Sequence, residues 1–160
     1  MKKLFLVACA ATIAAACGGQ VGEKYKEIEG LSSPGGREIR LSEVVEGNSY
    51  TLLDFWASWC RPCLVELPHM RAAYERFHDR GFEIYGVSYD EDGAAWRAMI
   101  EAERMNWVHV SALRGWNCPT QPLYGVDAIP RNCLIDRHGN IVAKNLRGEA
   151  LAQKLGELME

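Results

Sequence analysis

The chain is organised around the segment Trp59-Cys60-Arg61-Pro62-Cys63. The residues just before it, Leu52 to Trp56, are apolar apart from Asp54 and predict a buried strand. The residues after it predict a helix, because apolar side chains recur at intervals of three and four as far as Phe77. The two cysteines are therefore expected where a strand passes into a helix.

The amino end of a helix favours a thiolate at Cys60. The first backbone N–H groups of a helix have no intrahelical partner and carry a partial positive charge. Arg61 adds a full positive charge, and Pro62 suits the first helical turn, where a missing N–H costs nothing. A spacing of three returns Cys63 to the same helix face, within reach of a readily exchanged disulfide. The pattern predicts a redox centre in which an exposed Cys60 thiolate attacks a foreign disulfide and Cys63 resolves the mixed disulfide.

A C-x-x-C pair by itself also fits half of a zinc site or an inert structural disulfide. A zinc site needs a second pair of ligands, whereas Cys118 and Cys133 lie fifteen residues apart with no neighbouring ligand pair. Leu64 follows Cys63 and excludes the C-x-x-C-H motif of haem attachment. We therefore favour the redox pair, and we expect no metal and no cofactor other than the disulfide of Cys60 with Cys63.

Several motifs together resemble the thioredoxin superfamily. They are Asp54-Phe55-Trp56-Ala57, Trp59-Cys60-x-Pro62-Cys63, Pro68 and Ile129-Pro130. Glu66 in the pattern C-x-x-C-x-x-E-x-P, and the long insertion before Ile129, are similar to the membrane-anchored TlpA/ResA-like branch of AhpC/TSA-related thioredoxin-like proteins. The resemblance extends from Arg37 to Leu158. It implies an α/β thioredoxin-like fold with a central mixed sheet flanked by helices and a helix-strand insertion before a cis-proline loop.

The resemblance also implies roles for individual residues. Asp54 matches the buried acid of thioredoxins, so burial should raise its pKa and make it the proton acceptor for the catalytic Cys63. The alternative for Asp54 is a hydrogen-bonded structural carboxylate at the end of a strand. Ile129 and Pro130 match the cis-proline loop that holds the backbone of an extended substrate peptide.

Three further positions are open to two interpretations. Glu66 lies one turn beyond Cys63 and is either a proton relay or an ordinary surface side chain. Trp59 is expected at the rim of the site, where it would contact an incoming polypeptide substrate. Cys118 and Cys133 are either a second oxidisable pair or two separate thiols, free or structural, and we favour separate thiols.

Residues 1–16 predict a signal peptide. Lys2 and Lys3 precede a thirteen-residue apolar segment that ends at Ala16, too short to span a bilayer and typical of a secretion signal. Cys17 follows three alanines and resembles a lipoprotein processing site, although the usual leucine three positions earlier is missing. Ordinary cleavage near Ala16, with Cys17 incidental, is the alternative. We expect an extracytoplasmic lipoprotein, anchored through lipid on Cys17 and facing the periplasm of a bacterium.

The remaining chain predicts a flexible tether at residues 17–36 and one thioredoxin-like domain at residues 37–160. Strands are expected at residues 37–41, 50–56, 82–88, 107–110, 133–136 and 141–143. Helices are expected at residues 62–80, 94–105 and 120–124. Leu151, Leu155 and Leu158 predict a closing helix on the opposite face of the sheet.

The charge of the chain gives no sign of nucleic acid binding. The net charge is −3, and it becomes −5 if Lys2 and Lys3 are removed with a leader, since 16 basic residues then face 21 acidic ones. No basic patch is evident. The predicted function is a monomeric thiol-disulfide oxidoreductase that reduces disulfides of extracytoplasmic proteins. The resemblance implies that a membrane electron donor recharges it.

Two other functions fit the sequence less well. A thiol peroxidase of the peroxiredoxin type needs the motif Pro-x-x-x-Thr/Ser-x-x-Cys, which the sequence lacks. A non-enzymatic metal-binding or chaperone module, as in thioredoxin-fold copper-delivery proteins, favours C-x-x-x-C with a partner histidine, and both are missing. Rapid consumption of peroxide would favour the first alternative, and copper binding by the reduced protein would favour the second.

Overall fold

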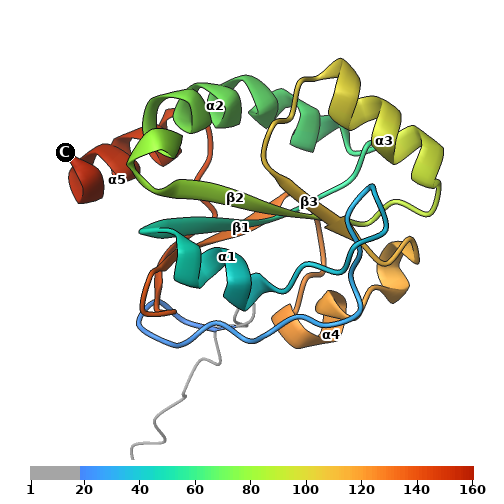
Figure 1. The fold of residues 1–160 in the computed structure, drawn as a ribbon, viewed down its shortest axis with the longest axis horizontal. Helices are drawn as coiled ribbons and strands as arrows, with labels where there is room; N and C mark the ends of the chain where they lie inside the picture. Colours follow the sequence, from blue (N-terminus) through green and yellow to red (C-terminus); the bar gives the residue numbers. More distant parts are fainter. Residues whose placement is uncertain (1–18) are drawn as a thin grey trace, which may run out of the picture.

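A computed structural model of the chain describes residues 19–160. The expected signal peptide and the lipidation site at Cys17 lie outside these residues. The described part forms a five-stranded mixed sheet, with helices on both of its faces (Figure 1). The strand order is β3-β2-β1-β4-β5. This arrangement confirms the predicted mixed sheet flanked by helices.

The described residues contain five strands and five α-helices. The strands are β1 (Tyr50–Trp56), β2 (Phe82–Ser88), β3 (Val108–Ser111), β4 (Arg131–Asp136) and β5 (Ile141–Lys144). The helices are α1 (Leu41–Gly47), α2 (Arg61–Phe77), α3 (Gly93–Ala102), α4 (Thr120–Tyr124) and α5 (Glu149–Met159). Short 3-10 helices cover His78–Arg80 and Gly115–Asn117.

β1 is the central strand of the sheet. It pairs in parallel with β2 and antiparallel with β4, and every residue after Tyr50 is buried. A strand covered on both faces reads as a nearly continuous apolar run, which is why its bounds agree with the prediction. The cysteine segment follows the carboxyl end of β1 and therefore lies at the middle of the sheet's width.

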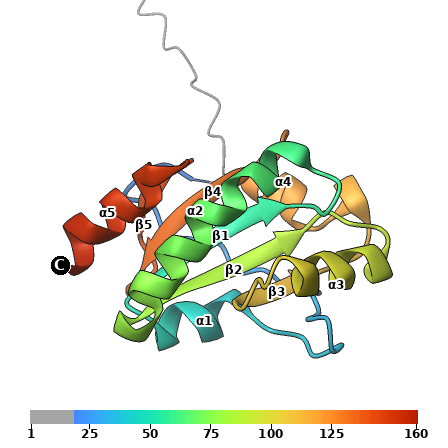
Figure 2. The ribbon, with the colours of Figure 1, turned by 90° about the horizontal axis from the view of Figure 1, so that it is seen from above.

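α2 lies diagonally across the sheet (Figure 2). α3 and α5 share its face, while α1 and α4 lie on the other face (Figure 1). α5 packs beside α2, and Arg76 of α2 pairs with Glu160 at the end of α5 at 2.6 Å. The prediction that the closing helix lies on the opposite face is therefore wrong. The spacing of Leu151 and Leu155 indicates a buried stripe but does not tell which face of the sheet receives it.

Residues 37–41 do not form the expected strand. Their pairing is limited to an isolated bridge between Ser32 and Glu38. α1 already begins at Leu41, with Arg40 as its N-cap residue. Leu41 is fully buried as the first residue of this short helix. Its apolar side chain therefore contributes to the core from a helix and not from a strand.

The described part of the expected tether, residues 19–36, packs against the domain. Ile28 and Leu31 are each 1% exposed. The Gly22 N–H donates to the Ile141 carbonyl and the Ile141 N–H donates to the Glu23 carbonyl, both at 2.8 Å, so this segment covers the start of edge strand β5. The packed domain thus begins well before residue 37. Glycine and charged residues dominate the composition of the segment, which is why the sequence predicts a tether. The burial of Ile28 and Leu31 is not evident from that composition.

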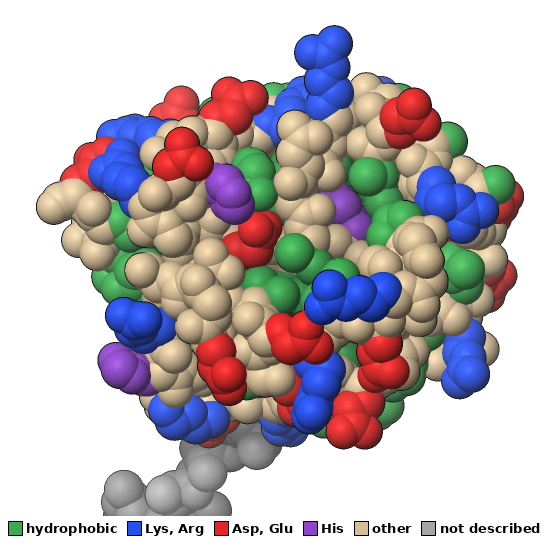
Figure 3. Space-filling view, viewed as in Figure 1, with side chains coloured by type: hydrophobic (Ala, Val, Ile, Leu, Met, Phe, Trp, Pro, Cys, Tyr) green, Lys and Arg blue, Asp and Glu red, His purple; other side chains and the backbone are tan. Residues whose placement is uncertain are grey.

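The surface carries both signs of charge. On the face in Figure 3, acidic and basic side chains are interspersed and form no patch of one sign. Among residues 19–160, no helix combines the length and the apolar character needed to cross a membrane.

The packing of residues 19–36 can be tested with two substitutions. Ile28→Ala should lower the free energy of unfolding by about 2–5 kcal/mol, because it empties a buried site in the core. Val21→Ala is the matched control, because Val21 is 62% exposed and its truncation should change stability by less than about 0.5 kcal/mol. Urea denaturation of both variants measures the difference. Equal stability of the two variants would contradict this packing.

Candidate active site

Cys60 and Cys63 form a disulfide at the amino end of α2. Their Cα atoms are 5.3 Å apart and their sulfurs 2.03 Å apart. Cys60 is the N-cap residue, and its sulfur accepts a hydrogen bond from the Cys63 N–H at 3.2 Å. After reduction, the same N–H groups and the positive end of the helix would favour a thiolate at Cys60.

The disulfide is less exposed than expected. Cys60 is 4% exposed and Cys63 is 3% exposed, whereas the neighbouring Trp59 is 56% exposed. The disulfide is therefore buried in this oxidised form, whereas the exposed thiolate at Cys60 was predicted for the reduced form. The sequence spacing places the pair at a helix end, but it does not tell how closely the surrounding chain covers it.

Asp90 fixes Ser58 in the turn that leads from β1 to the cysteines. Both the backbone N–H and the hydroxyl of Ser58 donate to the Asp90 carboxylate, and the Ser88 hydroxyl donates to it at 2.6 Å. Asp90 is 1% exposed, so these bonds replace the water that its carboxylate would otherwise hold. Sequence reasoning missed this residue. The available signal was an acid placed two residues after the apolar strand β2.

Asp54 lies on β1, opposite Asn132 of β4, and is 4% exposed. Burial raises the pKa of Asp54 to about 7. Burial is the largest effect. The Arg147 guanidinium and a hydrogen bond from Asn132 lower this pKa, and the Glu66 carboxylate raises it. An acid with such a pKa exchanges its proton near neutral pH, which suits a group that accepts and returns protons.

The loop between β5 and α5 joins several of the predicted residues. The Arg147 guanidinium donates to the carbonyl oxygen of Pro130. The next residue, Gly148, donates its N–H to the Glu66 carboxylate at 2.7 Å. Glu66 is therefore held by a backbone hydrogen bond. Sequence reasoning missed Arg147, because no motif surrounds it and only the fold brings it near Asp54.

The peptide bond between Ile129 and Pro130 is cis, as the resemblance implied. β4 begins at the next residue, Arg131, which pairs with Phe55 near the end of β1. The proline loop and the loop that carries Cys60 therefore lie at the same edge of the sheet.

Cys118 and Cys133 do not bond to each other. Cys118 is a free, buried thiol, and its sulfur lies 3.1 Å from the Thr120 hydroxyl oxygen. Cys133 is buried in β4 and is disulfide-bonded, so the preference for a separate thiol is wrong at that position. A second oxidisable pair made of Cys118 and Cys133 is absent from the described residues.

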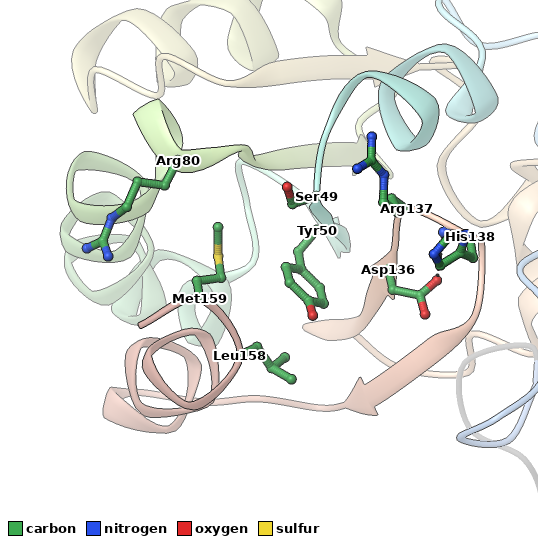
Figure 4. Close-up of a pocket in the computed structure, with 8 residues that line it drawn as sticks. All are labelled: Ser49, Tyr50, Arg80, Asp136, Arg137, His138, Leu158 and Met159. Atoms are coloured by element: carbon green, nitrogen blue, oxygen red, sulfur yellow. Dashed lines mark hydrogen bonds between the residues drawn. The ribbon is translucent and has the colours of Figure 1, made fainter.

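A pocket of about 380 Å³ lies at the other end of β1 (Figure 4). Its lining includes Tyr50, the first residue of β1, so the length of the strand separates it from Cys60. The side chains of Arg80 and Arg137 point in different directions, and Asp136 accepts a hydrogen bond from the His138 backbone (Figure 4). The polar groups do not converge on one point, so this pocket takes no part in the site. Among the described residues, no three or more His, Cys, Asp or Glu side chains are grouped to hold a metal ion.

Comparisons with known proteins agree with this geometry. Residues 21–144 match the model of the AhpC/TSA family. The chain is 32% identical over 125 residues to the thiol-disulfide oxidoreductase ResA of Halalkalibacterium halodurans, which covers 78% of this chain and 68% of that protein. It is 28% identical over 125 residues to ResA of Bacillus thuringiensis subsp. konkukian, which covers 78% and 69%. The crystal structure of the thioredoxin domain of a thiol-disulfide oxidoreductase from Bacteroides vulgatus superposes with a TM-score of 0.80 at 30% identity, covering 88% of this chain and 99% of that chain.

The pKa of Asp54 makes stability depend on pH. Between the ordinary pKa of 3.8 and about 7, the folded protein binds more protons at Asp54 than the unfolded chain, so the free energy of unfolding falls as pH rises. Asp54→Asn removes the buried charge. It should be more stable than the wild type at pH 8 by up to about 4 kcal/mol, and about equally stable near pH 4. Urea denaturation of the oxidised protein across this range measures the difference. The exposed Asp79→Asn is the control, and a difference that does not vary with pH would contradict the assignment.

Arg147 should set the position of this pH dependence. Arg147→Met removes a cation that lowers the pKa of Asp54, so the midpoint of the Asp54 titration should move to higher pH. Arg147→Lys keeps the charge and should move the midpoint less. Carbon-13 NMR of the Asp54 carboxyl group measures the midpoint directly. Arg137→Met, at the other end of β4, is the control. A midpoint that stays fixed or falls in Arg147→Met would show that the guanidinium does not act on Asp54.

Proposed function

The chain belongs to the AhpC/TSA family of thioredoxin-like proteins, and we propose that it is a thiol-disulfide oxidoreductase that reduces protein disulfides outside the cytoplasm. The observation that carries this proposal is the disulfide of Cys60 with Cys63 at the amino end of α2, at the same sheet edge as a cis-proline loop. Relatives named thiol-disulfide oxidoreductases support the enzyme class. The direction of electron transfer and the location are our inference.

The first step of the proposed reaction is a thiolate exchange. In the reduced protein, the Cys60 thiolate attacks one sulfur of the substrate disulfide. The Cys60–substrate sulfur bond forms as the substrate S–S bond breaks, and one substrate sulfur leaves as a thiolate. The positive end of α2 stabilises the attacking thiolate before this step.

The second step releases the substrate. Asp54 accepts the proton of the Cys63 thiol, and the Cys63 thiolate attacks the Cys60 sulfur. The mixed disulfide breaks, the Cys60–Cys63 disulfide forms, and the second substrate sulfur leaves as a thiolate. Two electrons have then passed from the enzyme to the substrate, so an external dithiol must reduce the enzyme before the next cycle.

The other predicted residues receive supporting roles. Ile129 and Pro130 would hold the substrate backbone at the edge of the sheet. Glu66 would relay protons or tune the pKa of Asp54, because its carboxylate raises that pKa. Trp59 would contact the substrate at the exposed rim of the site.

The cellular setting is also part of the proposal. The apolar amino-terminal segment and Cys17 support export followed by attachment to a membrane through lipid. Its substrates would be disulfide-bearing proteins in that compartment, and a membrane electron donor would supply the reducing dithiol. We propose that the enzyme acts there as a monomer.

The proposed reaction is tested with cysteine variants and insulin. The reduced wild type should reduce insulin disulfides, and Cys60→Ser should lose this activity by a factor of about 1,000 or more, because it lacks the attacking thiolate. Cys63→Ala should accumulate a mixed disulfide between Cys60 and the substrate, detectable by non-reducing mass spectrometry. Cys118→Ala should retain the activity. Failure of the reduced wild type to reduce insulin and small disulfides would overturn the proposal, and so would a Cys60 thiol that remains protonated well above neutral pH.

A further inference from the structure

A cavity of about 390 Å³ is lined by Ser58 and Trp59, the two residues that lead into Cys60. The rest of its lining comes from the chain that follows β2, as far as Ala95 of α3, and from the 3-10 helix at Gly115–Asn117. A polypeptide whose cysteine reacts at Cys60 would bring its neighbouring side chains to this cavity.

One wall of the cavity is aromatic. Tyr89 is fully buried, Trp116 is 44% exposed, and Trp59 is 56% exposed. The ring centroids of Tyr89 and Trp116 are 5.1 Å apart, and those of Trp116 and Trp59 are 6.4 Å apart. The rings thus form a continuous row from the core to the surface. Two exposed indole rings on a rigid base offer a large apolar contact area to a bound side chain.

The other wall is acidic. Asp90, Glu91 and Asp92 all line the cavity, and no lysine or arginine does. Asp90 is occupied by Ser58 and Ser88, and Asp92 accepts hydrogen bonds from the first N–H groups of α3. Glu91 differs from both, because it is exposed and forms no ion pair within residues 19–160.

Gly115 brings the Glu91 carboxylate next to the aromatic row. Its φ of 54° favours glycine, and a Cβ atom there would lie 2.7 Å from Glu91 Oε1. The Glu91 carboxylate therefore lies against the residue that precedes Trp116. The Arg97 guanidinium would lie 3.1 Å from a Cβ atom at Gly93 of α3, and Arg97 is not among the residues that line the cavity. An unpaired negative charge beside an exposed indole ring is suited to a cation.

We propose that Trp59, Trp116 and Glu91 form a substrate subsite for polypeptides that carry an aromatic or long aliphatic side chain and a lysine or arginine next to the reactive cysteine. This inference rests on the proposed function and names its substrate class. The apolar side chain packs against the two indole rings. The cation pairs with Glu91 and lies over the Trp116 ring. Acidic segments bind less tightly, because the three carboxylates of the cavity repel negative charge. Neutral segments bind less tightly, because they lack the cation that pairs with Glu91.

Three synthetic peptide disulfides test the subsite. They place Phe and Lys, Phe and Glu, or Ser and Lys beside one cysteine. Bis(2-hydroxyethyl) disulfide is the reference, because it is too small to fill the cavity. The ratio of kcat/KM for each peptide to that for the reference isolates the contribution of the subsite. In the wild type, the Phe-Lys peptide should give a ratio about 10-fold higher than either other peptide.

Variants assign this preference to residues. Glu91→Gln should reduce the preference for Lys over Glu to about 2-fold, and Glu91→Lys should reverse it. Trp116→Ala should reduce the preference for Phe over Ser about 5- to 10-fold. Glu101→Gln, an exposed position on α3, is the matched control and should keep the wild-type ratios. Equal ratios for all peptides in the wild type, or no change of preference in the Glu91 and Trp116 variants, would overturn the subsite.

A binding measurement separates this inference from the proposed reaction. The same peptides with serine in place of the reactive cysteine bind without chemistry, and quenching of tryptophan fluorescence in the oxidised protein reports their affinity. Tighter binding of the Phe-Lys peptide supports the subsite even if no disulfide is reduced. Equal binding of the three peptides overturns it even if the reference disulfide is reduced normally.

Discussion

The site depends on the burial of one carboxylate in the central strand. Asp54 sits where β1 is covered on both sides, and an isolated charge there would be costly. The protein relieves the cost in two ways: the acid holds its proton up to about pH 7, and a guanidinium and an amide act on its charged form. With a pKa of about 7, Asp54 gains or loses its proton near neutral pH, as the proposed role of proton acceptor requires.

The loop after β5 connects this acid to the rest of the site. Arg147 acts on Asp54 and also holds the carbonyl of Pro130, while Gly148 holds Glu66 on α2. Residues 147–148 therefore interact with α2, with the proline loop and with the buried acid Asp54. Before the cysteines in the chain, Asp90 fixes Ser58 by accepting its backbone hydrogen bond. Hydrogen bonds therefore hold the chain on both sides of the cysteine pair, at Ser58 before Cys60 and at Glu66 after Cys63.

Features that depend on local sequence could be predicted, and those that depend on distant contacts could not. The apolar runs of β1 and β2, the cysteine pair and the Ile129-Pro130 motif carry their own signals. Arg147 lies in a segment without a motif, and its role comes from long-range packing. The face chosen by α5 and the burial of Ile28 follow from the complete topology, because an apolar stripe has no preference for one buried surface over another.

Gly22 and Glu23 also protect an edge of the sheet. Both bond to the backbone of Ile141, the first residue of edge strand β5. An open edge strand offers unpaired N–H and C=O groups to which a strand of another molecule can add. Because these groups of Ile141 are already paired, the start of β5 is closed to such pairing and to the aggregation that it can cause.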